Sequence, residues 1–168
     1  AALKRAGVPA NWTLDMAVPQ NYAAHVQAGE MMQAMLGKVG VRVKLRPVEW
    51  GVWLSEVYGG KRNFDLTVIG HTGKLDPHGR LNGFDKPDTN YVGYNNPKAG
   101  EWINQAAAET NPTKRKALYA NVFRQMALDM PFVYLGASNT NFAFRKGISG
   151  FQITPYLDTF DFRDITLN

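Results

Sequence analysis

Two hydrophobic periodicities alternate over the first 70 residues, and this alternation limits the possible folds more than any other feature of the sequence. Stretches typical of a strand, a helix, a strand, a helix and a strand follow one another at residues 13–18, 23–39, 41–46, 50–58 and 64–69. In the first stretch, Leu14, Met16 and Val18 occupy every second position, which is the spacing of a strand with one buried face. This order predicts parallel strands joined by right-handed crossovers.

The second strand stretch has one apolar and one basic face. Apolar and basic side chains alternate along it as Val41, Arg42, Val43, Lys44, Leu45 and Arg46. A strand with cations along one face suits the edge of a sheet, and Pro47 is expected to end its regular pairing. The third stretch carries few charges, as a well-covered strand does. We therefore expect the spatial order second, first, third.

The first helical stretch has a broad apolar stripe. Its members are Ala24, Ala28, Met31, Met35 and Val39, with Met32 and Leu36 beside them. A methionine-rich stripe at helical spacing predicts packing against the core. Gly40 is expected to end this helix.

The second half of the chain begins with a long segment, residues 70–96, that is rich in Gly, Pro, Asp and Asn. A loop of this length is functional or disordered, and the aromatic side chains Phe84, Tyr91 and Tyr94 favour an ordered one. Two helices are expected to start at Asn96-Pro97 and Asn111-Pro112, each with an N-cap Asn before a Pro.

Two further strands are expected at residues 132–135 and 141–144, joined by a polar turn. The predicted fold class is therefore α/β: a small mixed sheet with a parallel βαβαβ core in the order 2-1-3, C-terminal helices and an antiparallel strand pair. The irregular tail, residues 150–168, carries Phe151, Tyr156, Phe160 and Phe162 and needs a surface to pack on.

Charge and composition exclude several classes of protein. The net charge is +5, but Lys and Arg are scattered, and no nucleic-acid-binding motif accompanies them, so we expect no nucleic-acid partner. The absence of Cys excludes disulfides, thiolate metal sites and cysteine nucleophiles. No apolar stretch is long enough to span a bilayer. The first residues resemble a helix end with Gly7 as its C-cap, as expected of a piece of a longer protein.

Polar and aromatic side chains follow all three predicted strands. These candidate ligand-binding residues are Gln20, Asn21 and Tyr22 after the first strand, Glu49 and Trp50 after the second, and His71 and Thr72 after the third. Ligands of open parallel sheets bind at the carboxyl ends of strands, so we interpret these residues as the floor of a cleft. Trp50 could stack on a ligand or pack, whereas Trp53 is expected in the core and His25 at the surface.

The loop at residues 71–80 has three possible functions. His71, Asp76 and His78 could hold a metal or serve an α/β enzyme, but their spacing matches no metal motif and no nucleophile elbow is present. We therefore predict no metal, no cofactor and no catalytic residue. In the preferred interpretation the loop faces a ligand, with Lys74, Asp76 and Arg80 added to the binding set. A protein-interaction module remains a further alternative.

Three stretches of sequence carry a family resemblance. They are LKRAGVPANWTLDMAVPQNY at the start, VQAGEMMQAMLGKVGVRVKLRPVEWGVWLSEVYGGKRNFDLTVIGHTG next, and YNNPKAGEWINQAAAETNPTKRKALYANVFRQMALDMPFVYL farther on. Together they resemble the C-terminal half of the family-5 extracellular solute-binding proteins, which serve peptide, nickel and related ABC importers.

The resemblance implies a periplasmic-binding-protein-like lobe that binds a peptide or another small solute and delivers it to an ABC permease in the membrane. Residues 1–149 would form this lobe, and residues 150–168 would return toward a first lobe that lies outside this chain. The implied location is periplasmic or otherwise extracytoplasmic, with association to the membrane through the transporter.

At the third strand the sequence departs from the family. His71 stands where the family has Trp, and Thr72 and Gly73 stand where peptide-binding members have the Asp that holds the peptide amino terminus. Asp76 aligns instead with a later Asp-Pro. This departure leaves a sugar, an opine-like compound or another solute as alternatives to a peptide.

Overall fold

A three-stranded parallel sheet forms the centre of the N-terminal part of the fold. The computed structural model describes residues 2–86, 88, 90–137, 139, 141–152 and 162–167. Strands β1 (Thr13–Pro19), β2 (Arg42–Val48) and β3 (Leu66–Thr67) lie side by side in the order β2-β1-β3. Both pairings are parallel, which confirms the predicted βαβαβ core and its strand order.

Strand β2 continues through Pro47, contrary to the prediction that this residue ends the pairing. Pro47 lies opposite Val18, and Val48 opposite Pro19. Because β2 is at the edge of the described sheet, the missing N–H of a proline that faces outward costs no ladder hydrogen bond. Strand β3 is shorter than residues 64–69, with only Leu66 and Thr67 paired.

Helix α2 (Ala23–Lys38) covers one face of the sheet. Its contacts with buried Met16 and Val18 come from Val26, Met32 and Leu36, and Gly29 is buried between them. The predicted stripe was wrong for four residues, since Met31, Met35 and Val39 are 61%, 61% and 63% exposed and Ala24 is exposed as well. The helix is apolar on two faces. The face that carries Gly29, Met32 and Leu36 lies against the strands, because Gly29 has no side chain to hold the helix away.

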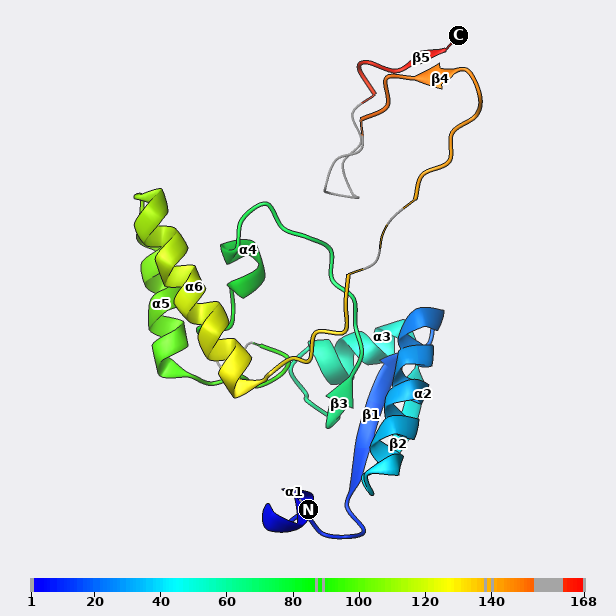
Figure 1. Cartoon of the computed structure of the whole chain (residues 1–168), viewed down its shortest axis with the longest axis vertical. Coiled ribbons are helices and arrows are strands. Elements are labelled where there is room, and N and C mark those ends of the chain that lie inside the picture. The colour runs from blue at the N-terminus through cyan, green and yellow to red at the C-terminus, as the bar shows by residue number, and fades with distance from the viewer. Residues whose placement is uncertain are drawn as a thin grey trace.

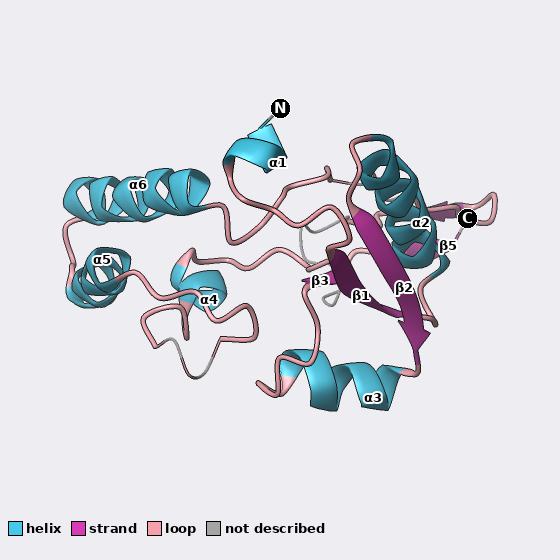
Figure 2. Ribbon diagram, turned by 90° about the horizontal axis from the view of Figure 1, so that it is seen from below, coloured by secondary structure: helices cyan, strands magenta, loops and turns pink. Residues whose placement is uncertain are grey.

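The opposite face of the sheet is covered by helix α3 (Trp50–Trp53) and the π-helical turn η1 (Leu54–Tyr58). Ala17 packs there against Trp53, Val57 and Tyr91, all of them buried. Figure 2 shows α2 and α3 on opposite sides of β1 and β2. Trp53 is therefore a core residue, as predicted.

Near the N-terminus, the short helix α1 (Ala2–Arg5) is followed by Gly7 at a φ of 70°, the left-handed conformation expected of a C-cap glycine. Among the described residues, no helix is both long and apolar enough to cross a membrane.

A second core lies under helices α4 (His78–Leu81), α5 (Pro97–Ala108) and α6 (Pro112–Asp129). Its buried residues are Leu81, Tyr94, Ala99, Ile103, Ala106, Tyr119, Val122 and Met126. Figure 1 shows α5 and α6 side by side as a hairpin beside the sheet.

Both predicted N-caps are confirmed, because Asn96 and Asn111 each accept two backbone hydrogen bonds. In the long loop Tyr91 and Tyr94 are buried, as expected of an ordered segment, whereas residues 70–75 are exposed.

The C-terminal residues contain an antiparallel pair, as predicted, but between other segments. Strands β4 (Ile148–Ser149) and β5 (Thr166–Leu167) form it, whereas residues 132–135 and 141–144 have no regular structure. Figure 1 shows the pair far from the sheet. Exposed apolar side chains precede it, at Val133, Tyr134, Leu135 and Phe144. Tyr156 and Phe160 of the predicted aromatic tail lie outside the described residues.

Candidate functional site

The carboxyl ends of the three strands meet at one edge of the sheet. Parallel pairing places them there, and two hydrogen bonds join the segments that follow. The Gln20 N–H donates to the Val48 carbonyl over 2.9 Å. The Gly70 N–H donates to Nε2 of His25 over 3.0 Å, which ties the third strand end to the first turn of α2. These two hydrogen bonds hold the three strand ends together at this edge, and their role as the floor of a cleft remains a prediction.

Aromatic rings connect the strand ends. Tyr22 contacts Trp50 edge-on at 5.5 Å between centroids, and Trp50 stacks on Trp53 at 5.2 Å and 6°. The series continues from Trp53 to Tyr58 at 5.9 Å and from Tyr58 to Tyr91 at 5.3 Å. Trp50 is half-buried, so it packs on Trp53 and still presents part of its ring.

His71 closes this series at the third strand end. Its Nε2 lies 3.1 Å from the hydroxyl of Tyr91, and the imidazole is exposed. Burial raises the pKa of the Tyr91 phenol to about 12, so the phenol is un-ionised at neutral pH. An un-ionised phenol can donate to Nε2 when the imidazole proton is on Nδ1, or accept from an Nε2 proton in the other tautomer.

Glu49 shapes the second strand end through the backbone. Its carboxylate accepts from the N–H groups of Gly51, at 2.6 Å, and Val52, at 3.2 Å, and so caps helix α3. This cap fixes where α3 begins, and with it the position of Trp50.

Asp76 links the loop to helix α6. Both of its oxygens accept from Arg115, at 2.6 and 2.9 Å, and one also accepts from the His78 N–H. The Arg115 guanidinium, foremost, lowers the pKa of Asp76 to about 2. The carboxylate is thus held by a bidentate ion pair.

No contact joins His71 to Asp76 or His78 among the described residues. The His71 ring contacts Tyr91 and the Asp76 carboxylate binds Arg115, while Nδ1 of His78 is buried without a hydrogen-bond partner in the residues that the structure describes. Within the described part of the chain, no three His, Cys, Asp or Glu side chains are grouped as a metal would need. The geometry gives the enzyme alternative no support.

The remaining predicted residues lie on the same loops. Gln20, Asn21, Thr72 and Lys74 are exposed, and Arg80 is half-buried on α4. Their ligand-binding role remains a prediction.

Sequence reasoning missed several residues of this region. His25 was expected at the surface, but it is half-buried and accepts from Gly70. Tyr58, Tyr91 and Arg115 were not assigned to the site. Tyr91 was visible as an aromatic residue in a polar loop, whereas no local pattern indicates that Arg115 reaches a loop 39 residues earlier.

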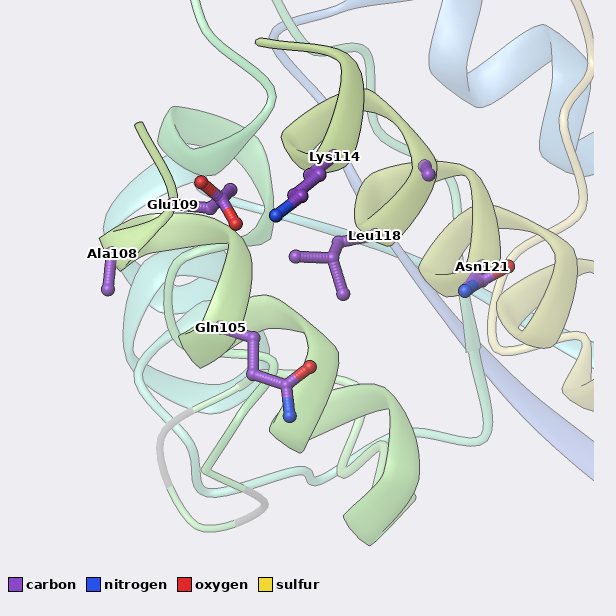
Figure 3. A pocket seen from close by; sticks show the side chains of 7 residues that line it. Gln105, Ala108, Glu109, Lys114, Leu118 and Asn121 are labelled. Atoms are coloured by element: carbon purple, nitrogen blue, oxygen red, sulfur yellow. The ribbon is translucent and has the colours of Figure 1, made fainter. Parts of the chain in front are cut away.

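A separate groove of about 620 Å³ lies between helices α5 and α6 (Figure 3). It is lined by Gln105, Ala108, Glu109, Lys114, Ala117, Leu118 and Asn121. None of these residues belongs to a strand end, so the groove is distinct from the surface described above.

Comparison with known proteins identifies the class. The family model for bacterial extracellular solute-binding proteins, family 5 Middle, matches residues 1–91. The chain therefore belongs to the family-5 extracellular solute-binding proteins.

Two curated relatives and one solved structure illustrate the match. Di/tripeptide-binding protein 1 of Pseudomonas aeruginosa is 28% identical over 164 residues, covering 92% of this chain and 30% of that protein. The glutathione-binding protein GsiB of Pectobacterium atrosepticum is 26% identical over 176 residues, covering 98% of this chain and 34% of that protein. The oligopeptide-binding protein AppA of Bacillus subtilis, solved with a nonapeptide, superimposes with a TM-score of 0.81 at 21% identity, covering 94% of this chain and 32% of that one.

The chain thus spans about a quarter to a third of the length of the curated relatives it matches. The structural likeness confirms the periplasmic-binding-protein fold of the lobe.

Proposed function

We propose that this chain forms one wall of a solute-binding cleft, and that the whole protein delivers a peptide or another small solute to an ABC importer. The observation that carries this proposal is the common edge on which the three strand ends present Tyr22, Trp50 and His71. Relatives named as peptide-binding proteins support the solute class. The opposite wall would come from a first lobe outside this chain.

Within this wall the side chains would have two kinds of role. Gln20, Asn21, Tyr22, Trp50, His71, Thr72, Lys74 and Arg80 would face the solute. Glu49 and Asp76 would position the binding loops without contacting the solute. The Glu49 carboxylate is bound by backbone N–H groups, and the Asp76 carboxylate is bound by Arg115. The solute would be bound and released unchanged.

Residues 150–168 would return toward the first lobe. Strand β4 would accompany them, because it pairs with β5. The exposed side chains of Val133, Tyr134, Leu135 and Phe144 support a covered position in the whole protein, because apolar groups gain free energy when they leave water. The protein would work outside the cytoplasm, at the membrane through its permease.

Native mass spectrometry of the whole protein, purified without unfolding, tests this function. We expect a mass excess of one small molecule, which denaturation releases chemically unchanged. A matched pair of variants locates the site: Trp50→Ala should lose the adduct, and Trp102→Ala on helix α5 should keep it. A protein that carries no solute, gains no thermal stability from a panel of peptides, sugars and opines, or converts one of them would contradict the proposal.

A further inference from the structure

The His25 side chain connects the three strand ends. It belongs to the first turn of α2, and its backbone N–H donates to the Tyr22 carbonyl over 2.9 Å, directly after the first strand end. Its ring contacts the ring of Tyr22 at 5.0 Å between centroids, and Tyr22 contacts Trp50 of the second strand end. Its Nε2 accepts from the Gly70 N–H of the third. One side chain therefore contacts two strand ends directly and the other through Tyr22.

The third strand end depends on this contact because the sheet no longer holds it. The pairing of β3 with β1 ends at Thr67, and the next two residues pack in the cores on the two faces of the sheet. Residues 70–75 are then exposed. The hydrogen bond from the Gly70 N–H to His25 holds the backbone at the point where this exposed segment begins. Loss of the bond would loosen the segment that carries His71 and Thr72.

Gly70 is in close contact with the His25 ring. A Cβ at this position would lie 3.1 Å from Nε2 and 3.7 Å from Cε1 of His25. The first distance is shorter than a Cβ normally makes with a neighbouring atom, so the absence of a side chain at Gly70 allows the backbone to approach the ring.

The hydrogen bond exists in one protonation state of the ring. The Gly70 N–H is a donor, whereas an imidazolium carries a proton on both nitrogens and offers no acceptor. Burial lowers the pKa of His25 from its ordinary 6.5, so the ring is neutral at neutral pH. The groups that face the ring are the phenol of Tyr22 and the backbone of Gly70, rather than a carboxylate that would favour the charged form. The next titratable side chain after Gly70 is His71.

We propose that His25 is a positioning residue of the cleft wall: its neutral imidazole holds the third strand end in place, and protonation of the ring frees this end and weakens the binding of the solute. This inference rests on the proposed function and adds a way in which the solute is released as the pH falls. A loosened segment must be ordered again when a solute binds, so loss of this one hydrogen bond should weaken binding about fivefold. The affinity is complete well above the pKa of His25 and falls as the pH drops through it.

Nuclear magnetic resonance of the isotope-labelled 168-residue chain tests the positioning without a solute. A scalar coupling across the hydrogen bond, between the Gly70 nitrogen and Nε2 of His25, should be present near pH 7.5 and absent near pH 5, about 1 and about 1.5 units on either side of the ordinary value. Over the same range, relaxation should show that the backbone of residues 70–72 becomes more mobile. A coupling that is absent near pH 7.5, or a backbone that does not respond when His25 titrates, contradicts the proposal.

Two variants of His25 separate the hydrogen bond from the ring contact. His25→Gln keeps an acceptor for the Gly70 N–H, loses the ring and does not titrate. His25→Phe keeps a ring against Tyr22 but offers no acceptor. We expect residues 70–72 to stay ordered at both pH values in the Gln variant and to be mobile at both in the Phe variant. The reverse result would assign the effect to the ring contact and contradict the proposal.

Two glycine variants test the same contact from the other side. Gly70→Ala should push the ring away from the backbone and make residues 70–72 mobile, as His25→Phe does. Gly37→Ala lies on the same helix as His25, where a Cβ meets nothing within 4 Å, and should leave these residues ordered. A scalar coupling that survives in Gly70→Ala would show that the ring and the backbone are not in contact.

The effect on binding is measured on the whole protein with the solute that it carries from purification. The natural protein and His25→Gln are dialysed for equal times near pH 7.5 and near pH 5, about 1 and about 1.5 units on either side of the ordinary value, and native mass spectrometry measures the fraction that keeps the adduct. We expect the natural protein to lose more adduct in acid than His25→Gln. The ionisation of His71 and of the solute is common to both proteins, so the difference between them belongs to His25.

The two proposals fail separately. A whole protein that keeps its solute in acid, or loses it equally with and without His25→Gln, contradicts the role of His25 in release and leaves the proposed function intact. A whole protein that carries no solute contradicts the proposed function, while the coupling to Gly70 and the mobility of residues 70–72 still decide whether His25 positions the third strand end.

Discussion

His25 is the side chain that ties helix α2 to the third strand end. Its Nε2 accepts from the Gly70 N–H, so the neutral ring must carry its proton on Nδ1. That Nδ1 atom is buried without a hydrogen-bond partner among the described residues. Protonation of Nε2 would replace an acceptor with a donor facing another donor, and the bond to Gly70 would break.

This arrangement predicts a pH dependence of stability. Burial lowers the pKa of His25 from its ordinary 6.5, so the unfolded chain binds the proton more readily than the folded one. The contribution of His25 is therefore present above pH 6.5 and is lost as pH falls through the lower folded value. Thermal unfolding at pH 7.5 and pH 5.5, about a unit on either side of the ordinary value, should show this loss for the natural chain.

The variant His25→Gln provides the control for that measurement. Its amide oxygen can accept from Gly70 but does not titrate, so the variant should keep most of the stability at high pH and lose less on acidification. The ring of His71 is exposed, so His71→Gln should leave the change in thermal stability between pH 7.5 and pH 5.5 nearly the same as in the natural chain. Equal slopes for His25→Gln and the natural chain would contradict the assigned tautomer.

The ion pair of Asp76 and Arg115 predicts a separate effect in acid. The lowered pKa of Asp76 means that its contribution to stability is complete above pH 3.8 and disappears as pH falls through about 2. Asp76→Asn should therefore be less stable than the natural chain at neutral pH, and the two should converge near pH 2. Urea unfolding of Asp76→Asn, Arg115→Gln and the double variant measures the coupling. Strictly additive losses would show that the two side chains do not interact.

At the scale of elements, the sheet was predictable and the buried face of α2 was not. Strand order followed from local alternation, from the charged face of β2 and from the handedness of crossovers. Helix α2, in contrast, has apolar residues on two faces, and the prediction placed Met31 in the stripe and Met32 only beside it, whereas Met32 is the one that packs on the sheet. The burial of Gly29 decides between the faces, because only a residue without a side chain allows the helix to lie this close to the strands.

Two glycines of α2 test this packing. A Cβ at Gly29 would lie 2.9 Å from Leu45 Cδ1 and 3.3 Å from Val18 Cγ1, whereas a Cβ at Gly37 meets nothing within 4 Å. Gly37→Ala should stabilise the chain by up to about 1 kcal/mol through helix propensity alone. Gly29→Ala receives the same propensity gain but must displace core side chains, and we expect a net loss of stability. Chemical denaturation of both variants measures these changes. A gain of stability in both would show that Gly29 does not lie in the contact between helix α2 and the sheet.

The C-terminal strands show where local pattern is insufficient. Residues 132–135 and 141–144 have the apolar character of strands, yet a strand also needs backbone partners from another segment. The pair forms instead between Ile148–Ser149 and Thr166–Leu167. Similarly, the sequence placed Asp76 on a binding loop but could not show that Arg115 of a later helix would occupy its carboxylate.

For the whole molecule, the account requires a second wall. The chain spans about a third of the length of Di/tripeptide-binding protein 1 and carries one side of the proposed cleft. A single wall leaves a bound solute exposed to water, so the 168-residue chain should bind the solute of the whole protein weakly or not detectably. Isothermal titration calorimetry of both proteins measures the difference. Tight stoichiometric binding by the chain alone would show that it contains a complete pocket.

The crystal structure of the whole protein with the solute that it carries would test the central claim most directly. We predict that the solute contacts side chains from at least two of the strand ends, among them Tyr22, Trp50 and His71. A solute bound elsewhere, for example in the groove between α5 and α6, with all three strand ends turned away from it, would contradict the account.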